Sequence, residues 1–404
     1  MQRRVVVTGC GVVTAAGTEL DSFWNALMSG TCFIKPLRNF SAPDLEGLMG
    51  AEVDLPEADD LPEPGDHRRS RCGQLALAAA RRALADAALP HGSEVRERAG
   101  VVLGTTLGSE RQVGDLSERW AVHGPDSVDA GFLARCDNHS LAALVAERHG
   151  LGGPLMLCAS ACSSGNAAIA LAYDLVASGV ADAMVAGGAD TLTRSIYCGF
   201  QRMGALSKSI CRPFDKRRDG VSFGEGAGVL VLESLDEARR RGARIYAEIA
   251  GYGMSNDAYH VTAPDPNGEG FVRAIKQALS STGTAPEQVD YVSAHGTGTQ
   301  YNDLGEARAM KAVFGERAGR VPISSIKSMI GHTNGAASAI EAVACALAMM
   351  HETIPPTANL TEPDPECDLD CVPGKGRRAR VDHCLNLAAG FGGFNVCLVL
   401  RRAT

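Results

Sequence analysis

The sequence predicts an α/β protein built from two similar halves, and two observations support this. Short apolar runs, such as residues 183–187 and 229–233, alternate with Ala-rich helical stretches. This alternation is typical of sheets that helices cover on both faces. After about residue 245 the order strand, helix, strand and Gly-rich turn recurs. We therefore expect an N-terminal half at residues 1–245 and a C-terminal half at residues 246–404.

Each expected element follows from its local pattern. In the first half, continuous apolar runs predict strands, and an amphipathic Ala-rich stretch and a charged stretch predict helices. These elements are strands at residues 3–8, 101–104, 183–187 and 229–233, and helices at residues 72–88, 167–177 and 236–241. The second half is read in the same way, with strands at residues 247–252, 289–294, 385–389 and 396–400, and helices at residues 270–280 and 336–350.

Composition excludes several classes of protein. The 404 residues are 45 % hydrophobic and 21 % charged, with a net charge of −8, which suits a large folded core and disfavours a nucleic-acid binder. We find no apolar run long enough for a membrane span and no secretory signal, so we expect a cytoplasmic protein. The 13 cysteines include no Cys-x-x-Cys pair, and we expect reduced thiols and no metal site.

Cys162 is the candidate nucleophile. It lies in Ala-Cys-Ser-Ser-Gly (161–165) and precedes a long apolar helix. Unpaired amides at a helix N-terminus favour the thiolate, which is the nucleophilic form of cysteine. A buried structural cysteine is the alternative interpretation.

Two histidines follow in Gly-rich or polar contexts. His295 opens the turn His-Gly-Thr-Gly-Thr after an expected strand, where an imidazole suits acid/base or hydrogen-bonding work, although it could also fix the turn. His332 stands five residues after Lys327, which needs an acidic partner if it is buried, and Glu306 is our candidate for that partner. An exposed, solubilising Lys327 is the alternative.

The stretch Gly-Phe-Gly-Gly (390–393) lies between two expected strands. Three glycines in four residues weaken a strand. We therefore expect the backbone here to have a special task, such as donating an N–H group to an oxyanion. A plain hairpin turn is the alternative. One cysteine and two histidines on separate Gly-rich turns make a coherent site for acyl transfer from a thioester.

Together these clusters resemble the β-ketoacyl-[acyl carrier protein] synthases of the thiolase superfamily, over essentially the whole chain. The resemblance implies a thiolase-like five-layered αβαβα fold of two similar halves, usually dimeric. Several segments, including 238–253, 322–332 and 354–370, look closer still to the ketosynthase α subunit of type II polyketide synthases. That subunit pairs with a chain-length factor, a homologue that lacks the nucleophile.

The resemblance implies a role for each site residue. Cys162 would accept the acyl group, and His295 and His332 would assist decarboxylation of a malonyl group and stabilise the enolate. Lys327 and Glu306 would organise the site. The amides of Cys162 and Phe391 would form the oxyanion hole, and Phe391 would gate malonyl entry. The implied contacts of the phosphopantetheine arm are the residues Thr297 and Thr299.

The resemblance also implies partners. The prosthetic group would belong to an acyl carrier protein, and the enzyme would need no cofactor of its own. Carrier proteins are acidic, so a basic patch is needed; the run His-Arg-Arg-Ser-Arg is our candidate, with Arg68, Arg69 and Arg71 as docking residues, although it could be a solvated helix start. We expect a heterodimer with a chain-length-factor homologue, or otherwise a homodimer.

Four functions remain open from the sequence. A type II polyketide ketosynthase, with an aromatic or a polyene product, is favoured by Ala389 and Phe394, which differ from the usual fatty-acid pattern. The run His-Thr-Asn-Gly-Ala-Ala (332–337) is closer to fatty-acid elongation enzymes of the synthase II type. The third function is that of a thiolase-like acyltransferase acting on coenzyme A thioesters, and the fourth is that of a non-catalytic scaffold resembling a chain-length factor.

Overall fold

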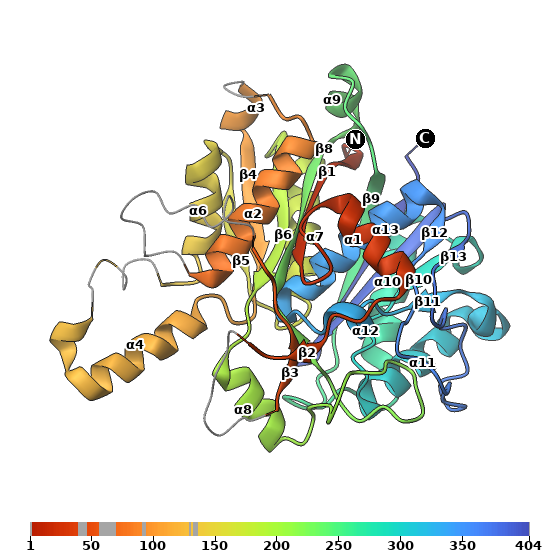
Figure 1. Ribbon diagram of the computed structural model, residues 1–404. Helices are drawn as coiled ribbons and strands as arrows, with labels where there is room; N and C mark the ends of the chain where they lie inside the picture. The colour runs from red at the N-terminus through yellow and green to blue at the C-terminus, as the bar shows by residue number, and fades with distance from the viewer. Residues whose placement is uncertain are drawn as a thin grey trace.

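The computed structural model describes residues 2–38, 47–55, 70–90, 94–128, 131 and 136–403 (Figure 1). The strands are β1 Val5–Thr14, β2 Lys35–Pro36, β3 Met49–Ala51, β4 Ala99–Gly104, β5 Leu155–Cys158, β6 Ala183–Asp190, β7 Phe223–Gly224, β8 Gly226–Ser234, β9 Ala247–Asn256, β10 Tyr291–Ser293, β11 Ile323–Ser324, β12 Thr353–Ile354, β13 Arg377–Arg378, β14 His383–Gly390 and β15 Phe394–Arg401. The α-helices are α1 Leu20–Ser29, α2 Arg71–Asp86, α3 Glu94–Glu97, α4 Glu110–His123, α6 Ser140–His149, α7 Ser164–Ala177, α8 Arg194–Arg202, α9 Leu235–Arg240, α10 Glu269–Thr282, α11 Gln300–Phe314, α12 Lys327–Ile330 and α13 Ala337–His351.

The main strands form two five-stranded arrays with the same order and direction. The first runs β1-β8-β6-β4-β5 and the second runs β9-β15-β14-β10-β11. In each array, the first two pairs of neighbouring strands are antiparallel and the last two pairs are parallel. A short antiparallel ladder, Val5–Val7 against Ala247–Ile249, joins the arrays through β1 and β9. The repeat expected from the order of elements is therefore present, and its second copy begins at β9. On this ground we propose that the two halves divide at 245/246.

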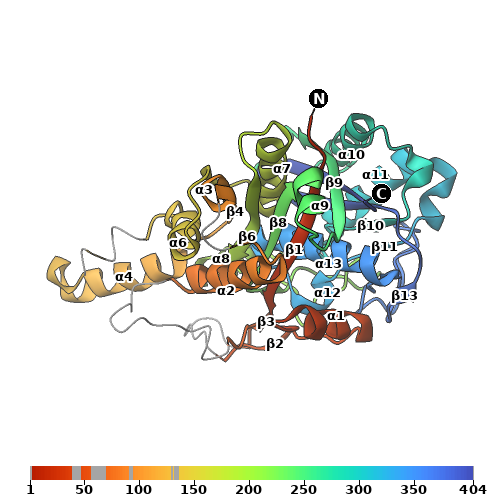
Figure 2. The same ribbon diagram turned by 90° about the horizontal axis from the view of Figure 1, so that it is seen from above.

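The helices form three layers around these two arrays. Helices α7 and α13 pack against each other and contact strands of both arrays, so they make the central layer. Helix α2 packs on β1, β8 and β6, and α6 packs on β4 and β5, whereas α10 packs on β9 and β15 with α11 beside it. Figure 2 shows α2 and α10 on different sides of the strands. This is the five-layered arrangement that the resemblance predicts.

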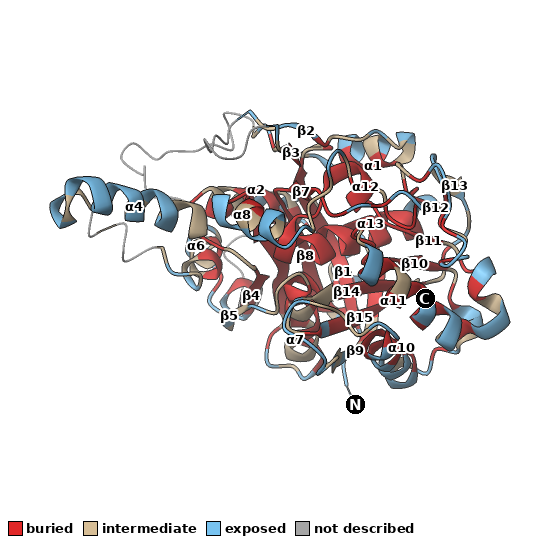
Figure 3. Ribbon diagram, turned by 90° about the horizontal axis from the view of Figure 1, so that it is seen from below, coloured by how far each residue is buried: buried red, intermediate tan, exposed pale blue. Residues whose placement is uncertain are grey.

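Burial explains why these sequences form these elements. All ten residues of β1 are buried, as a continuous apolar run requires when helices cover both faces. Helix α13 is buried from Ala337 to Met349 (Figure 3), which accounts for a helix whose residues are mostly apolar on all sides. Small residues allow close packing between layers, because a Cβ atom at Gly11 would lie 2.0 Å from the Ala79 oxygen of α2.

Helix α4 is the exception to this packing. It extends away from the layers (Figures 1 and 2) and has no buried residue. The sequence pattern did not predict this helix. Among the described residues, no helix is long and apolar enough to cross a membrane.

Candidate active site

The Cys162 turn links β5 to the buried helix α7. Ala161, just before the cysteine, has a φ of +50°, a left-handed conformation that costs energy for a residue with a Cβ atom. Two hydrogen bonds hold it: the Ser164 hydroxyl donates to the Ala161 oxygen at 2.6 Å and accepts from the Ser160 N–H at 2.9 Å. The turn therefore fixes Cys162 in the loop that enters α7.

The electrostatics of Cys162 differ from the sequence expectation. The residue is half-buried, and loss of hydration raises the pKa of its thiol to about 12. The Lys327 ammonium and the backbone N–H groups of Cys162 and Phe391 act in the opposite direction. The expected stabilisation of the thiolate is therefore outweighed by burial. The two amides implied for the oxyanion hole nevertheless lie at the sulfur.

Gly390 explains how the Phe391 loop approaches the nucleophile. The loop is the hairpin between β14 and β15, so the simpler interpretation of a turn is also correct. A Cβ atom at Gly390 would lie 2.8 Å from the Ser160 oxygen and 3.2 Å from the Cys162 nitrogen. Only glycine allows the loop to pack this closely against the nucleophile.

The two histidines form a buried pair. Their ring centroids are 5.5 Å apart and the rings are nearly perpendicular, at 84°. His332 accepts the Asn334 N–H at its Nδ1 atom, at 3.2 Å, so its proton lies on Nε2, which has no hydrogen-bond partner among the described residues. Nδ1 of His295 is also without a partner in that part of the chain.

Both imidazoles are neutral. Burial lowers the pKa of His295 well below its usual value, with further lowering from Lys327 and His332. Burial and Lys327 lower the pKa of His332 in the same way. Neutral imidazoles can donate a hydrogen bond to a carbonyl oxygen without carrying a charge of their own.

The carboxylate partner of Lys327 differs from the predicted one. The Lys327 ammonium pairs with Glu341 of α13, and each side chain is only 1 % exposed. Glu306 instead accepts the backbone N–H groups of His295, at 2.7 Å, and Gly296, at 2.9 Å. Its position on α11, eleven residues after His295, lets it hold the histidine turn rather than the lysine. Lys327 is a buried cation, so the interpretation as an exposed charge is wrong.

Two buried acids have raised pKa values for the same reason. Burial raises the pKa of Glu306 to about 8, against the opposing effect of its two backbone donors and Lys327. Burial likewise raises the pKa of Glu341 to about 7, although Lys327 lowers it.

The predicted threonines lie together, whereas Arg71, one of the three predicted docking arginines, is bound within the protein. The Thr297 and Thr299 hydroxyl oxygens are 2.8 Å apart, beside His295. Arg71 is bound to the buried carboxylate of Glu225, at 2.9 Å, so it is a structural ion pair rather than a free docking residue. Arg68 and Arg69 lie outside the described residues.

Sequence reasoning missed two buried acids at this site. Glu341 is the lone charged residue in the mostly apolar stretch 336–350, and that isolation was an available signal. Asp190 ends β6 and accepts the Thr106 and Gly335 N–H groups, each at 2.7 Å, which ties the loop after β4 to the loop after His332. A single Asp after an apolar strand was the only indication of it.

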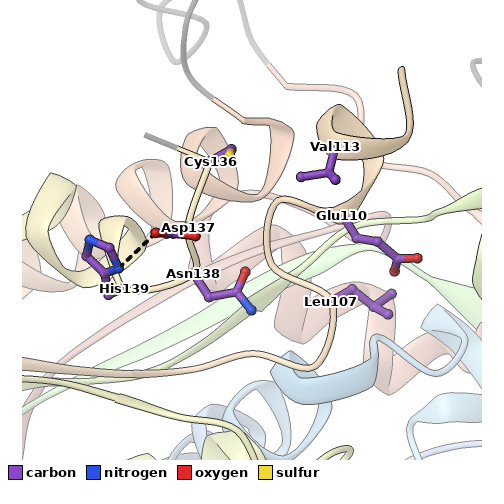
Figure 4. Close-up of a pocket in the computed structure, with 7 residues that line it drawn as sticks. All are labelled: Leu107, Glu110, Val113, Cys136, Asp137, Asn138 and His139. Carbon is purple, nitrogen blue, oxygen red and sulfur yellow. Dashed lines mark ion pairs between the residues drawn. The ribbon is translucent and has the colours of Figure 1, made fainter. Parts of the chain in front are cut away.

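A cavity of about 490 Å³ lies beside the base of α4 (Figure 4). Leu107 and Val113 are among its lining residues, and the nearby ion pair joins His139 to Asp137 at 3.9 Å. The Leu107 N–H donates to Asp190, so the cavity adjoins the loop that Asp190 connects to the histidine site. Among the described residues, no group of His, Cys, Asp and Glu side chains is placed to hold a metal ion.

Comparison with known proteins gives the family. Residues 2–238 match the model of the β-ketoacyl synthase N-terminal domain, and residues 246–361 match that of the C-terminal domain. The 3-oxoacyl-[acyl-carrier-protein] synthase 2 of Synechocystis sp. is 41 % identical, over 99 % of this chain and 98 % of the relative.

Two solved structures are similar along their whole length. The ishigamide ketosynthase/chain length factor has a TM-score of 0.94 at 39 % identity, with 100 % of both chains covered. A type II polyketide ketosynthase in complex with its acyl-carrier protein, bound to the hexaketide, has a TM-score of 0.92 at 33 % identity, again with 100 % coverage of both. The chain, with its thiolase-like fold, therefore belongs to the β-ketoacyl synthases, the condensing enzymes of the acyltransferase class.

Proposed function

We propose that this enzyme elongates a polyketide chain in a type II system by decarboxylative condensation with a malonyl group on an acyl carrier protein. The observation that carries the proposal is the neutral imidazole pair, 5.5 Å apart, in a site where two backbone amides face the Cys162 sulfur. A thiol, an oxyanion hole and two uncharged donors match the three tasks of the reaction: acyl transfer, oxyanion stabilisation and enolate stabilisation.

The first half-reaction transfers the acyl group. The Cys162 sulfur attacks the carbonyl carbon of the acyl-carrier thioester, and the amides of Cys162 and Phe391 hold the oxygen as it becomes negative. The carbon–sulfur bond to the carrier then breaks. The proton of the Cys162 thiol leaves with the phosphopantetheine thiol, so the products are an acyl-cysteine and a free carrier thiol.

The second half-reaction forms the carbon–carbon bond. The bond between the malonyl carboxylate and its neighbouring carbon breaks, carbon dioxide leaves, and the electron pair forms an enolate. Hydrogen bonds from the neutral imidazoles of His295 and His332 would stabilise the enolate oxygen. The enolate carbon attacks the acyl-cysteine, and the expelled sulfur takes up a proton. A thiol with a pKa of about 12 regains that proton readily.

Lys327 and Glu306 support this chemistry without reacting. Together with burial, the larger effect, the Lys327 charge keeps both histidines neutral, and Glu306 holds the backbone of the His295 turn. Thr297 and Thr299 would contact the phosphopantetheine arm, which the carrier protein supplies, so we propose no cofactor of the enzyme's own.

We propose a chain-length-factor homologue as the partner, with a homodimer as the alternative. One of the similar structures is of a ketosynthase/chain length factor, and another includes an acyl-carrier protein. On this chain, β5 is the terminal strand of the first array, and its Leu155 and Met156 are 47 % and 40 % exposed. Helix α4 exposes Trp120 and Val122 on the same side of the fold (Figure 1). An open strand edge and exposed apolar side chains suit a protein partner.

Fatty-acid elongation is the second candidate, because the sequence also resembles elongation enzymes of the synthase II type and the Synechocystis relative at 41 % identity is named a 3-oxoacyl-[acyl-carrier-protein] synthase 2. The product distinguishes the two. The chain is purified with and without a co-expressed homologue and given malonyl-carrier protein, and mass spectrometry identifies carrier-bound products. We expect poly-β-keto or polyene chains; saturated chains formed with fatty-acid partners would favour the second candidate.

The reaction itself is tested by Cys162→Ala, with Cys158→Ala as the matched control on the adjacent strand. We expect Cys162→Ala to abolish condensation while decarboxylation of malonyl-carrier protein continues. Cys158→Ala should retain both. Full condensation by Cys162→Ala would overturn the proposed function. Failure of iodoacetamide to label Cys162 in the native chain would instead support a scaffold role. A preference for coenzyme A thioesters over carrier thioesters would favour a thiolase-like activity.

Carrier docking on Arg68 and Arg69 remains a proposal. Charge reversal at both positions should raise the KM for carrier protein and leave the alkylation rate of Cys162 unchanged. An unchanged KM would place the docking surface elsewhere.

A further inference from the structure

We propose that Phe200 holds the Phe391 ring in place over the nucleophile site, so that Phe200 is a positioning residue that controls access to Cys162. The proposal rests on the proposed function, in which Phe391 is the gate. Phe200 lies on α8, far from Phe391 in the sequence, and none of the sequence motifs includes it.

The contact between the two rings is specific. The Phe200 and Phe391 rings stack with their planes 5° apart and their centroids separated by 5.2 Å. Phe391 is 37 % exposed, so its ring lies at the boundary between the site and the surface. The amide of the same residue faces the Cys162 sulfur. The stack therefore fixes the Phe391 ring, which the proposed function places between the thiol and the exterior.

Phe200 is itself held from the inside of the protein. Its ring meets Phe223 edge to face at 4.8 Å and 87°, and Phe223 is fully buried. The Phe223 ring in turn lies 6.1 Å from the His332 imidazole, at 26°. The backbone on either side of Phe223 is bonded to His332, because the His332 N–H donates to Ser222 and the Gly224 N–H donates to His332. A continuous series of rings thus connects the gate to the catalytic histidine.

Hydrogen bonds hold the backbone of the Phe391 loop, so the position of the Phe391 ring depends on its side-chain contacts. The Gly392 N–H donates to the Val261 oxygen at 2.7 Å, and the Asn256 side chain donates to the Gly392 oxygen at 2.8 Å. With the backbone fixed in this way, the Phe391 ring opens the site by rotating about its side-chain bonds, and this rotation breaks the stack on Phe200. An offset aromatic stack is strong enough to shift such an equilibrium by about twofold to tenfold.

The experiment measures the rate at which iodoacetamide alkylates Cys162, followed by peptide mass spectrometry. Phe200→Leu keeps an apolar side chain but removes the flat ring, and we expect the rate to rise about twofold to tenfold. Phe200→Tyr keeps the ring and should react like the wild type. Phe314→Leu, at the end of α11 and away from the gate, is the control for loss of a buried ring and should also react like the wild type.

A double variant tests whether Phe200 acts through Phe391. In a Phe391→Ala background the stack is already lost, so Phe200→Leu should change the alkylation rate no further. An equal increase in both backgrounds would show a general loosening and would overturn the proposal. So would a wild-type rate for Phe200→Leu, or for Phe200→Met if the leucine variant does not fold.

Alkylation needs no carrier protein, acyl group or partner. The ring contact is therefore tested even if the enzyme proves to make another product. Conversely, a failed condensation assay with normal gate behaviour would overturn the proposed function and leave this inference standing. In a competent enzyme, Phe200→Leu should also raise the wasteful hydrolysis of acyl-Cys162 by a similar factor, while Phe200→Tyr restores it to the wild-type level.

Discussion

The ammonium group of Lys327 is paired with the carboxylate of Glu341 inside the protein, where each side chain is only 1 % exposed. The pair joins the loop that carries His332 to the central helix α13. Its cation lowers the pKa of the Cys162 thiol and of both histidines. One buried charge therefore acts with burial to keep the imidazoles uncharged, and against burial to make the thiol more acidic.

Removing the Lys327 charge should raise the pKa values of His295 and His332. Lys327→Met together with Glu341→Gln leaves no unpaired charge in the core, and the histidine pKa values should rise toward their usual value of about 6.5. At pH 6 more imidazole would then be protonated, whereas at pH 8 both forms of the protein would have neutral imidazoles. The measurement is ¹⁵N NMR of labelled histidine between pH 4 and pH 8.

The single variant Glu341→Gln is the control, because it keeps the Lys327 charge and should keep the histidines neutral at pH 6. Unchanged histidine titration in the double variant would contradict the role that we assign to Lys327.

Loss of His332 should separate the two half-reactions. His332→Ala removes the Nε2–H donor that has no partner among the described residues, and loss of one such donor typically costs about 10²–10³ in rate. We expect malonyl decarboxylation to fall by that factor, while acyl transfer to Cys162 continues. Separate assays of carbon dioxide release and of acyl-enzyme formation check this. An equal loss in both steps would show that His332 supports the site as a whole.

Glu306 should make stability depend on pH. Its pKa in the fold, about 8, exceeds the usual 4.5, so the fold favours the neutral carboxyl group. This contribution to stability is complete below about pH 4.5 and is lost as pH rises toward 8, at up to about 1.4 kcal/mol per pH unit.

Glu306→Gln cannot ionise and lacks this dependence. Urea unfolding at pH 5 and pH 8 should therefore show that the wild type loses more stability over this interval than the variant does. Parallel losses in the two proteins would mean that Glu306 does not titrate in this range.

A single added methyl group should disable the nucleophile loop. In Gly390→Ala the new Cβ atom would lie 2.8 Å from the Ser160 oxygen, so the loop or the Cys162 turn must move. We expect acyl transfer to fall at least about tenfold, since displacement of an oxyanion donor is costly. Gly319→Ala, where a Cβ atom would contact nothing within 4 Å and the backbone is not left-handed, provides a control for the loss of a glycine. A normal acylation rate in Gly390→Ala would show that this loop does not contribute to the oxyanion hole.

The main strands and the central helices could be predicted because burial leaves a direct pattern. The apolar stretch 336–350 corresponds to α13 at Ala337–His351, and the strand expected at 183–187 corresponds to β6, which extends to Asp190. Helix α4 could not be predicted in the same way. None of its residues is buried, so no contact with the core accounts for its sequence.

Within the site, motifs identified the residues but not their partners. Cys162, His295 and His332 stand in distinctive local sequences, whereas the pairing of Lys327 depends on a contact across fourteen residues that only the packing of α13 establishes. The expectation that Cys162 is stabilised as a thiolate is wrong for a related reason. A helix N-terminus is visible in the sequence, but the atoms that remove water from the thiol are not.

The acyl-enzyme itself tests the account most directly. The wild-type protein is mixed with an acyl-carrier thioester, without malonyl groups, and digested for peptide mass spectrometry. We predict one acyl group, carried on the Cys162 peptide, with the other twelve of the thirteen cysteines unmodified. Acyl transfer to a different residue, or none while Cys162 remains reactive toward iodoacetamide, would contradict the account.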